Sequence, residues 1–197
     1  MLKRKKVKGV NNNIKLLTKI GRRGTINIYG NESELIVGKN VNWNHFSITI
    51  RGNNTKVYIG ERVSFDDGVV IKVIGNNSKL IIEEDTTIGR DTLIMSFDGK
   101  KIHIGKDCMI SRYVHIRNSD GHSIRNKEGI LINNANDIDI GSHVWLGHRV
   151  TVLKGCWVGT GTVVGACSTL TSKRYNEASI YAGNPAKLIR TDIFWER

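Results

Sequence analysis

A histidine with an acidic neighbour lies in a stretch of the sequence that breaks the regular pattern on either side of it. The stretch reads IRNSDGHSIRNKEGILINNAND, residues 116–137, and contains His122 and, two residues earlier, Asp120. The unperturbed pKa of histidine is near ~6.5, so a neutral imidazole can accept a proton at neutral pH. Asp120 could orient that imidazole, as the carboxylate of a catalytic triad does, or could only form a turn in the sequence NSDG. We therefore treat His122 as a candidate general base and Asp120 as its candidate orienting residue.

A six-residue spacing of aliphatic side chains follows this stretch and indicates the element that must position it. The aliphatic series is Ile140, Leu146, Val152, Val158, Val164 and Leu170. Small or β-branched residues stand four positions after the first five of these, at Val144, Val150, Cys156, Thr162 and Ser168. This is the hexapeptide pattern of a parallel β-helix, in which three hexads form one coil. A β-sandwich would not keep a strict six-residue count over so many repeats.

The earlier part of the chain repeats with a coarser period. Val37, Ile59, Ile82 and Ile104 recur at spacings of 22, 23 and 22 residues. The residues beyond three hexads are expected to form turn insertions at GNES, GNNT and GNNS, because Gly and Asn tolerate positive φ angles. Each coil buries its aliphatic residues against the next, so no repeat would fold alone.

The expected organisation is one all-β domain over residues 1–197. Residues 1–20 form a basic N-terminal segment, and residues 21–172 form the β-helix. Residues 117–136 form a loop insertion that protrudes and carries His122 away from the coils. The last segment, 173–197, is expected to be an arm or short helix that caps the end of the stack.

Composition limits the classes of partner. The chain has 197 residues and a formal net charge of +12, which favours polyanionic partners. Nucleic acid is not expected, because no nucleic-acid-binding signature is present and aromatic residues make up only 7% of the chain. No apolar run approaches the ~20 residues of a membrane span, so we expect a soluble, cytoplasmic protein. The three cysteines, Cys108, Cys156 and Cys167, are expected to be small core residues without disulfides.

Several motifs together resemble one known class of enzymes. These are the hexads, the interrupting loop with IRNSDGHSI, the segment HVWLGHRVTVLKG and the late AGNPAKLIR. They are similar to the hexapeptide-repeat acyltransferases that fold as left-handed β-helices, and within them most similar to the capsular polysialic acid O-acetyltransferases. The maltose and galactoside O-acetyltransferases are more distant. The specific motifs cover roughly residues 80–193, and residues 20–80 are similar only as generic repeat.

The resemblance implies a left-handed β-helix assembled as a homotrimer, with active sites between neighbouring subunits and acetyl-CoA as donor. It implies that His122 is the catalytic base and that Trp145, at the end of its hexad and at a corner of the coil, borders donor and acceptor. An exposed ring stacked on the next coil is the alternative for Trp145. The backbone amide of His148, after Gly147, is implied as the donor that stabilises the oxyanion.

The resemblance also implies a donor-binding region near the end of the stack. Gly165 and Ala166 would allow the pantetheine to approach the backbone, with Thr171 beside it, although small residues also serve packing. A basic end would contact the phosphates of the donor, or be only a solvated surface; it consists of Lys173, Arg174, Lys187 and Arg190. Where galactoside-type enzymes have a helper asparagine, this sequence has Asp91 or Thr92. The remaining histidines, His45, His103, His115, His143 and His148, lie in the repeats and are interpreted as face or turn residues.

The sequence therefore predicts an acetyl-CoA-dependent O-acetyltransferase that modifies a sugar hydroxyl of a surface polysaccharide. The alternative is a small-sugar or antibiotic O-acetyltransferase of the same fold. The basic charge favours an anionic polysaccharide, which could meet a cleft lined by Arg51, Arg62, Lys72 and Arg90. A metal-dependent trimer or a scaffold without activity is disfavoured, because the histidines show no zinc-ligand pattern and a scaffold would not need the His122 loop.

Overall fold

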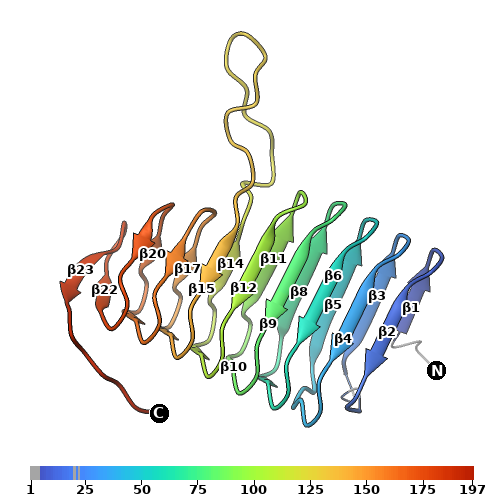
Figure 1. The fold of residues 1–197 in the computed structure, drawn as a ribbon, viewed down its shortest axis with the longest axis horizontal. Coiled ribbons are helices and arrows are strands. Elements are labelled where there is room, and N and C mark those ends of the chain that lie inside the picture. Colours follow the sequence, from blue (N-terminus) through green and yellow to red (C-terminus); the bar gives the residue numbers. More distant parts are fainter. Residues whose placement is uncertain (1–4, 20, 22) are drawn as a thin grey trace.

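A computed structural model of the protein describes residues 5–19, 21 and 23–197, and within them every regular element is a β-strand. The strands wind in coils and form three sheets along the length of the stack (Figure 1). Sheet A contains β1 (Lys5–Lys8), β3 (Thr25–Tyr29), β5 (Phe46–Arg51), β8 (Val69–Ile74), β11 (Leu93–Phe97), β14 (His115–Arg117), β17 (Thr151–Val152) and β20 (Thr169–Leu170). Sheet B contains β2 (Asn13–Leu16), β4 (Glu34–Val37), β6 (Lys56–Ile59), β9 (Lys79–Ile82), β12 (Lys101–Ile104), β15 (Ile138–Ile140), β18 (Trp157–Val158) and β21 (Arg174–Tyr175). Sheet C contains β7 (Ser64–Phe65), β10 (Thr87–Ile88), β13 (Met109–Ile110), β16 (Trp145–Leu146), β19 (Val163–Val164), β22 (Ile180–Ala182) and β23 (Lys187–Arg190).

The chain passes from sheet A to sheet B to sheet C in each full coil, so three corners run along the stack: the A–B, B–C and C–A corners. Within the sheets, paired strands are parallel except β22 and β23, which are antiparallel. The expected parallel β-helix is confirmed. No helix long and apolar enough to cross a bilayer occurs in the described part of the chain.

Ladders of aliphatic side chains fill the inside of the coils. In sheet B, Val37, Ile59, Ile82 and Ile104 are consecutive partners, and all four are fully buried. The later series from Ile140 to Leu170 is also buried, one residue to each strand from β15 to β20. The coarse period of the early coils and the six-residue period of the later coils therefore both mark residues of one continuous core. Alternate residues of each strand face inward, and this is the physical reason for the regular spacing.

The turn insertions GNES, GNNT and GNNS lie at the A–B corner, between β3 and β4, β5 and β6, and β8 and β9. Gly30, Gly52 and Gly75 have φ angles of 141°, 137° and 98°, as the turns require. The side-chain oxygen of Asn53 accepts from the amide of Asn31, and that of Asn76 accepts from the amide of Asn53, each at 2.9 Å. These bonds tie successive turns together.

The stack begins earlier and ends later than the sequence pattern indicates. Strands β1 and β2 lie in the segment 1–20. The sequence of β1, KKVK, is charged and exposed, and this strand joins sheet A through backbone pairing with β3. After residue 172, β21 and β22 continue the coils, and β23 folds back on β22. The C-terminal segment therefore contains strands and an extended tail, and the short helix expected as an alternative is not formed there.

The cysteines are free, and one differs from expectation. Cys108 and Cys156 are buried, and burial raises the pKa of their thiols to about 11 and about 12. Cys167 is exposed, at the C–A corner, so its interpretation as a core residue is wrong. Its φ of 60° places it in the turn itself, outside the inward-facing positions of the strands.

Candidate active site

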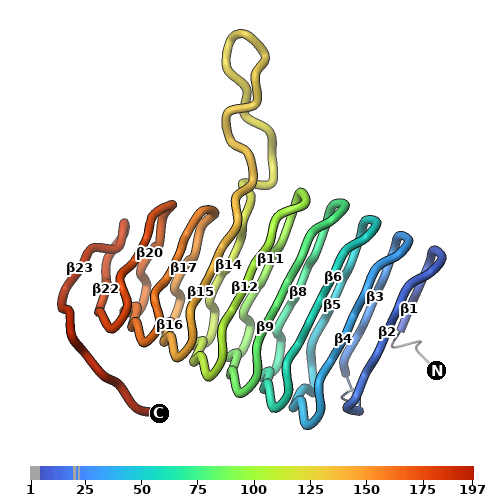
Figure 2. The backbone as a smooth tube through the Cα atoms, in the orientation of Figure 1, coloured from blue at the N-terminus to red at the C-terminus, as the bar shows by residue number. Residues whose placement is uncertain are grey.

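The protruding loop, residues 117–136, replaces the short A–B turn of the other coils with a long hairpin (Figures 1 and 2). Its first residues still belong to the stack: Asn118 is fully buried, and its side-chain oxygen accepts from the amide of Phe97 at 2.7 Å. Further out, Arg125 and Leu131 form an antiparallel bridge between the two arms of the loop. The loop is thus a hairpin anchored in the core.

His122 lies at the base of this hairpin and is exposed. Its imidazole makes no hydrogen bond to any described residue, while its carbonyl accepts from Nδ2 of Asn133 at 2.8 Å. Asn133 also donates to Oδ2 of Asp120 at 2.9 Å and accepts from the amide of Ile124 at 2.7 Å. Asn133 therefore fixes the backbone around His122 from the opposite arm and leaves the ring free.

Asp120 pairs with a cation from another coil. Nζ of Lys154, from the A–B corner that follows β17, lies 2.6 Å from Oδ2 of Asp120 and also donates to the carbonyl of Asn133 at 3.0 Å. This hydrogen bond to Lys154, with the one from Asn133, lowers the pKa of the Asp120 carboxyl. Triad logic expects Asp120 to contact and orient the His122 imidazole. Asp120 makes no such contact in the described chain, and it anchors the loop instead.

A pocket of about 620 Å³ opens beside the loop. His122, Asn133, Asp98, Lys100 and Ser119 are among the residues that line it. A free imidazole at the wall of a polar pocket can accept a proton from a hydroxyl placed there. Lys154 and Asn133, which hold this geometry, were not identified in the sequence. Lys154 lies 34 residues from Asp120, and the partners of Asn133 lie on the opposite arm of a loop that has no periodic pattern.

Trp145, Gly147 and His148 lie on a different side of the stack. Trp145 is in β16 of sheet C with its side chain outward, so it lies on a strand and not at the corner expected from its hexad. Gly147 and His148 follow at the C–A corner, whereas the loop leaves the A–B corner. Figure 1 shows the loop beyond one edge of the stack and sheet C strands such as β10 at the opposite edge. One chain does not bring these three residues to His122.

The corner at Gly147 is tightly packed. A Cβ at this position would lie 2.7 Å from the carbonyl oxygen of Val164 and 2.8 Å from the amide nitrogen of Ala166, so glycine is needed for stacking. The amide N–H of His148 has no hydrogen-bond partner in the described chain, and the same holds for Ala166 one coil later. A free amide is therefore a property of this corner. It makes the oxyanion role of His148 chemically available, since a fixed N–H can stabilise developing negative charge.

Two histidines near this corner carry buried nitrogens without partners, Nε2 of His115 and Nδ1 of His148. The His148 ring packs edge-on against Tyr113, with centroids 5.5 Å apart. Burial, with the charge of Arg117, lowers the pKa of His115, so its ring is neutral at neutral pH. Buried polar atoms usually find a partner, and these two nitrogens are exceptions that lie beneath the surface of this corner.

The expected donor-binding residues are spread over the last coils. Gly165 and Ala166 occupy the C–A corner below Gly147, while Thr171 lies at the A–B corner. Lys173 is over the ring of Tyr175 at 4.8 Å, and Arg174 is over the ring of Trp157 at 4.7 Å. Lys187 and Arg190 are exposed on β23. The basic residues share the end of the stack, whereas Thr171 is separated from Gly165.

The residues expected at the acceptor are also dispersed. Thr92 is buried and donates to the carbonyl of Ser111 at 3.1 Å, while Asp91 is exposed at the C–A corner. Arg62 forms a bidentate pair with Asp85, with its nitrogens 2.6 and 2.8 Å from the carboxylate oxygens. Arg51 and Lys72 lie on sheet A, and Arg90 lies at the C–A corner. These four cations do not line one cleft in a single chain.

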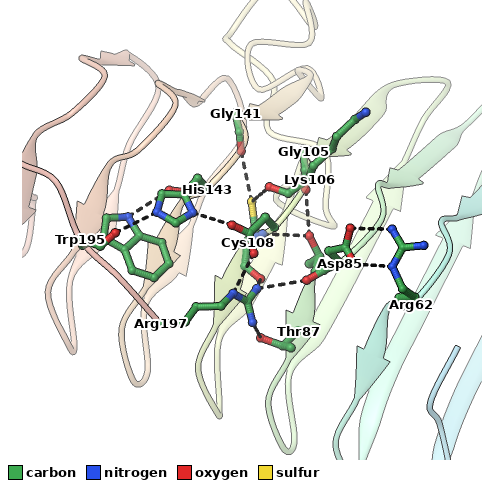
Figure 3. A network of polar contacts seen from close by, with 12 residues as sticks. Arg62, Asp85, Thr87, Gly105, Lys106, Cys108, Gly141, His143, Trp195 and Arg197 are labelled. Atoms are coloured by element: carbon green, nitrogen blue, oxygen red, sulfur yellow. Dashed lines mark hydrogen bonds and ion pairs between the residues drawn. The ribbon is translucent and has the colours of Figure 1, made fainter. Parts of the chain in front are cut away.

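A C-terminal strap, residues 191–197, runs back from β23 along the B–C corner toward Trp145. Trp195 stacks on His143 with centroids 4.0 Å apart, and its Nε1 donates to the His143 carbonyl at 3.0 Å. Arg197 donates to Asp107 at 2.8 Å and to the Cys108 carbonyl at 2.9 Å (Figure 3). Trp195 is also 5.9 Å from Trp145, ring to ring. The strap therefore supports the sheet C surface from one side.

Comparison with known proteins agrees with this architecture. Residues 137–172 match the family model described as bacterial transferase hexapeptide (six repeats), which defines the class as hexapeptide-repeat transferases. The chain is 35% identical over 191 residues to the polysialic acid O-acetyltransferase of Neisseria meningitidis, covering 96% of this chain and 87% of that protein. The chain belongs to the hexapeptide-repeat acetyltransferase family that includes the polysialic acid O-acetyltransferases.

Two solved structures show the same fold. The polysialic acid O-acetyltransferase OatWY has a TM-score of 0.86 and 32% identity, with 98% of this chain and 91% of that chain covered. The polySia-specific acetyltransferase NeuO has a TM-score of 0.83 and 33% identity, with 98% and 88% covered. Both the class and the family expected from the sequence motifs are thereby confirmed. Among the described residues, no group of three or more His, Cys, Asp or Glu is placed to hold a metal ion.

Proposed function

We propose that the protein transfers the acetyl group of acetyl-CoA to a hydroxyl of an anionic, sialic acid-containing capsular polysaccharide in the cytoplasm. The acceptor class is suggested by the names of the relatives with high coverage, and acyl-CoA is the donor that an acetyltransferase of this family implies. The net charge of +12 supports an anionic acceptor.

One observation carries the proposed mechanism: the loop with the free His122 imidazole and the surface with Trp145, Gly147 and His148 lie at opposite edges of one chain. An active site that needs both is incomplete in a single copy. We propose a homotrimer in which the protruding loop of one subunit reaches the C–A corner of the next. The free amide N–H of His148 at that corner supports this arrangement, because a fixed donor there can serve the reaction.

In the proposed reaction, His122 accepts the proton of the acceptor hydroxyl as its oxygen attacks the thioester carbon. The new C–O bond forms, the carbonyl becomes an oxyanion, and the amide N–H of His148 stabilises that charge. The C–S bond then breaks and the thiolate of CoA takes the proton from His122. Trp145 borders donor and acceptor, and Gly165, Ala166 and Thr171 lie along the pantetheine. The phosphates of CoA meet the basic end that contains Lys173, Lys187 and Arg190.

The test is transfer of label from radiolabelled acetyl-CoA to a panel of capsular glycans and neutral sugars. Substitution His122→Ala should lower kcat by about 10²- to 10⁴-fold and leave the affinity for acetyl-CoA nearly intact, because it removes only the base. His45→Ala, a change at another exposed histidine, is the matched control. A variant with more than about half of the wild-type rate would remove His122 from the mechanism, since a base contributes far more than twofold. Equal efficiency on neutral small sugars would favour the small-sugar alternative.

A further inference from the structure

Three lysines occupy one position on consecutive coils of sheet B. Lys56, Lys79 and Lys101 are the first residues of β6, β9 and β12, and each is the register partner of the next. Adjacent strands in a sheet lie about 4.8 Å apart. Since Val57, Leu80 and Ile102 point into the core, the three ammonium groups stand in a row on the outer face.

Most of this charge is not neutralised within the chain. Nζ of Lys101 lies 3.3 Å from Oδ2 of Asp139. Lys56 and Lys79 form no ion pair in the described part of the chain, nor does the neighbouring Lys100. Glu34 is the register partner of Lys56 on the other side, so one carboxylate flanks the start of the row; it accepts from Asn13 at 3.1 Å and forms no ion pair with Lys56 in the described residues. Like charges on neighbouring strands repel, so an external anion would relieve the repulsion.

A hollow of about 450 Å³ lies along this row at the A–B corner. Lys79, Lys100 and Lys101 line it, together with Asn54 and Asn77. One carboxylate, that of Asp137, also lines the hollow and accepts from the backbone amide of Lys101 at 2.7 Å. Nδ2 of Asn54 donates to Oδ1 of Asn77 at 2.8 Å, and the Nδ2 donors of Asn77 make no hydrogen bond to described residues. The hollow therefore offers cations for carboxylates and amide groups for hydroxyls.

This hollow adjoins the pocket of His122. Lys100 lines both, because it stands at the A–B corner directly before the coil from which the loop emerges. A chain molecule that fills the hollow and crosses Lys100 arrives at the free imidazole. Regularly spaced cations suit a ligand with regularly spaced anions, since several weak contacts then share one ordering cost.

We propose that the lysine track, defined as Lys56, Lys79, Lys100 and Lys101, binds the part of the acceptor chain that lies outside the reacting residue. Its ligand is a glycan with a carboxylate on successive residues, running along the stack axis toward His122. The proposal rests on the proposed function for the identity of the ligand. The track also explains why an acceptor polymer would be preferred to a single sugar.

The test uses the double variant Lys56→Gln/Lys79→Gln in the otherwise complete protein. Both side chains are exposed, and Lys101, Lys100 and the His122 pocket are unchanged. The apparent KM for long polysialic acid should rise by about threefold for each lysine removed, since exposed ion pairs are individually weak. The kcat should not change, and the KM for a short sialic acid oligomer should change little. Lys39→Gln, an exposed lysine at the B–C corner, is the matched control, and Lys56→Arg/Lys79→Arg should restore binding of the polymer.

Binding of long polysialic acid without acetyl-CoA, measured by affinity electrophoresis, separates this proposal from the proposed function. If wild-type protein acetylates the polymer and the double variant has unchanged KM and unchanged binding, the lysine track is refuted and the function stands. If no glycan is acetylated but binding depends on Lys56 and Lys79, the track stands and the function fails. An equal loss in Lys39→Gln, or equally tight binding of a single-stranded DNA oligonucleotide of the same charge, would also refute a dedicated glycan track.

Discussion

Asn133 joins the two arms of the protruding loop with three hydrogen bonds, to Asp120, to the carbonyl of His122 and to the amide of Ile124. No other described side chain contacts both sides of His122 in this way. Because Asn133 acts on the backbone, it positions the imidazole without contacting a reacting atom. Its contribution should therefore depend on geometry and not on proton transfer.

We expect Asn133→Ala to lower kcat between about 10- and 100-fold, because small displacements of a reacting group are costly. The KM for acetyl-CoA should stay at the wild-type value, and the pH dependence of kcat should keep its shape. Lys127→Ala, at the exposed end of the same loop, is the control. A shifted pH profile would instead mean that Asn133 acts on the titration of the base.

The ion pair between Asp120 and Lys154 makes the loop base sensitive to acid. The pKa of Asp120 is lowered in the folded protein, so the stabilisation is fully present above the ordinary pKa near ~3.9 and is lost as the pH falls through the lowered value. Pepsin cleavage within the loop should increase below about pH 4, while the coils stay resistant. In Lys154→Gln the loop should be cut more readily at higher pH as well. Each measurement is compared with Lys154→Gln at the same pH, because pepsin itself becomes more active in acid; equal cleavage of the two proteins at every pH would contradict this.

At the scale of elements, the coils could be predicted from the sequence, whereas the C-terminal strap could not. Val37, Ile59, Ile82 and Ile104 predicted the core because a coil repeats the same inward position at every turn. The strap has no such period: Trp195 meets His143, and Arg197 meets Asp107, across distances along the chain that no local pattern encodes. The sequence suggests His122 as the partner of Asp120 because the two residues are close along the chain. In the fold Asp120 pairs with Lys154, which no local pattern indicates. Strand β1 is exposed and joins the stack by backbone pairing, so its sequence carries no core signal. Strand β2 did carry one, because Ile14 and Leu16 continue the aliphatic ladder as partners of Leu35 and Val37.

We expect Trp195→Ala to lower the melting temperature and to increase the exposure of sheet C. Trp195 is 8% exposed and loses both its stacking on His143 and its hydrogen bond, and large aromatic truncations at buried sites cost about 3 kcal/mol. Differential scanning calorimetry would measure the change. Phe194→Ala, at a ring that is 80% exposed, should leave the melting temperature nearly unchanged. A similar loss in both variants would mean that the strap contributes no specific contact.

At the scale of the whole molecule, a site divided between two edges of one chain can be tested by mixing subunits. His122→Ala and Trp145→Ala should each be inactive as pure trimers. After dissociation and reassembly of an equal mixture, about a quarter of the interfaces should combine an intact loop with an intact sheet C surface. Activity should recover to about that fraction. No recovery, or a monomer by light scattering, would contradict a site shared between subunits.

Lys56 and Lys79 occupy the same position in consecutive coils. A whole coil could therefore be removed from this protein, or added to it, at this position. Residues 56–78 constitute one complete repeat, so their excision would join Thr55 to Lys79 and preserve the register of the coils, while the Arg62–Asp85 ion pair would be lost. The row of cations would become one step shorter, and His122 would keep its surroundings. If the proposed lysine track binds the acceptor, the number of repeats before the loop would set the length of chain that is engaged, and gain or loss of whole repeats would alter chain-length selectivity without any change in the chemistry.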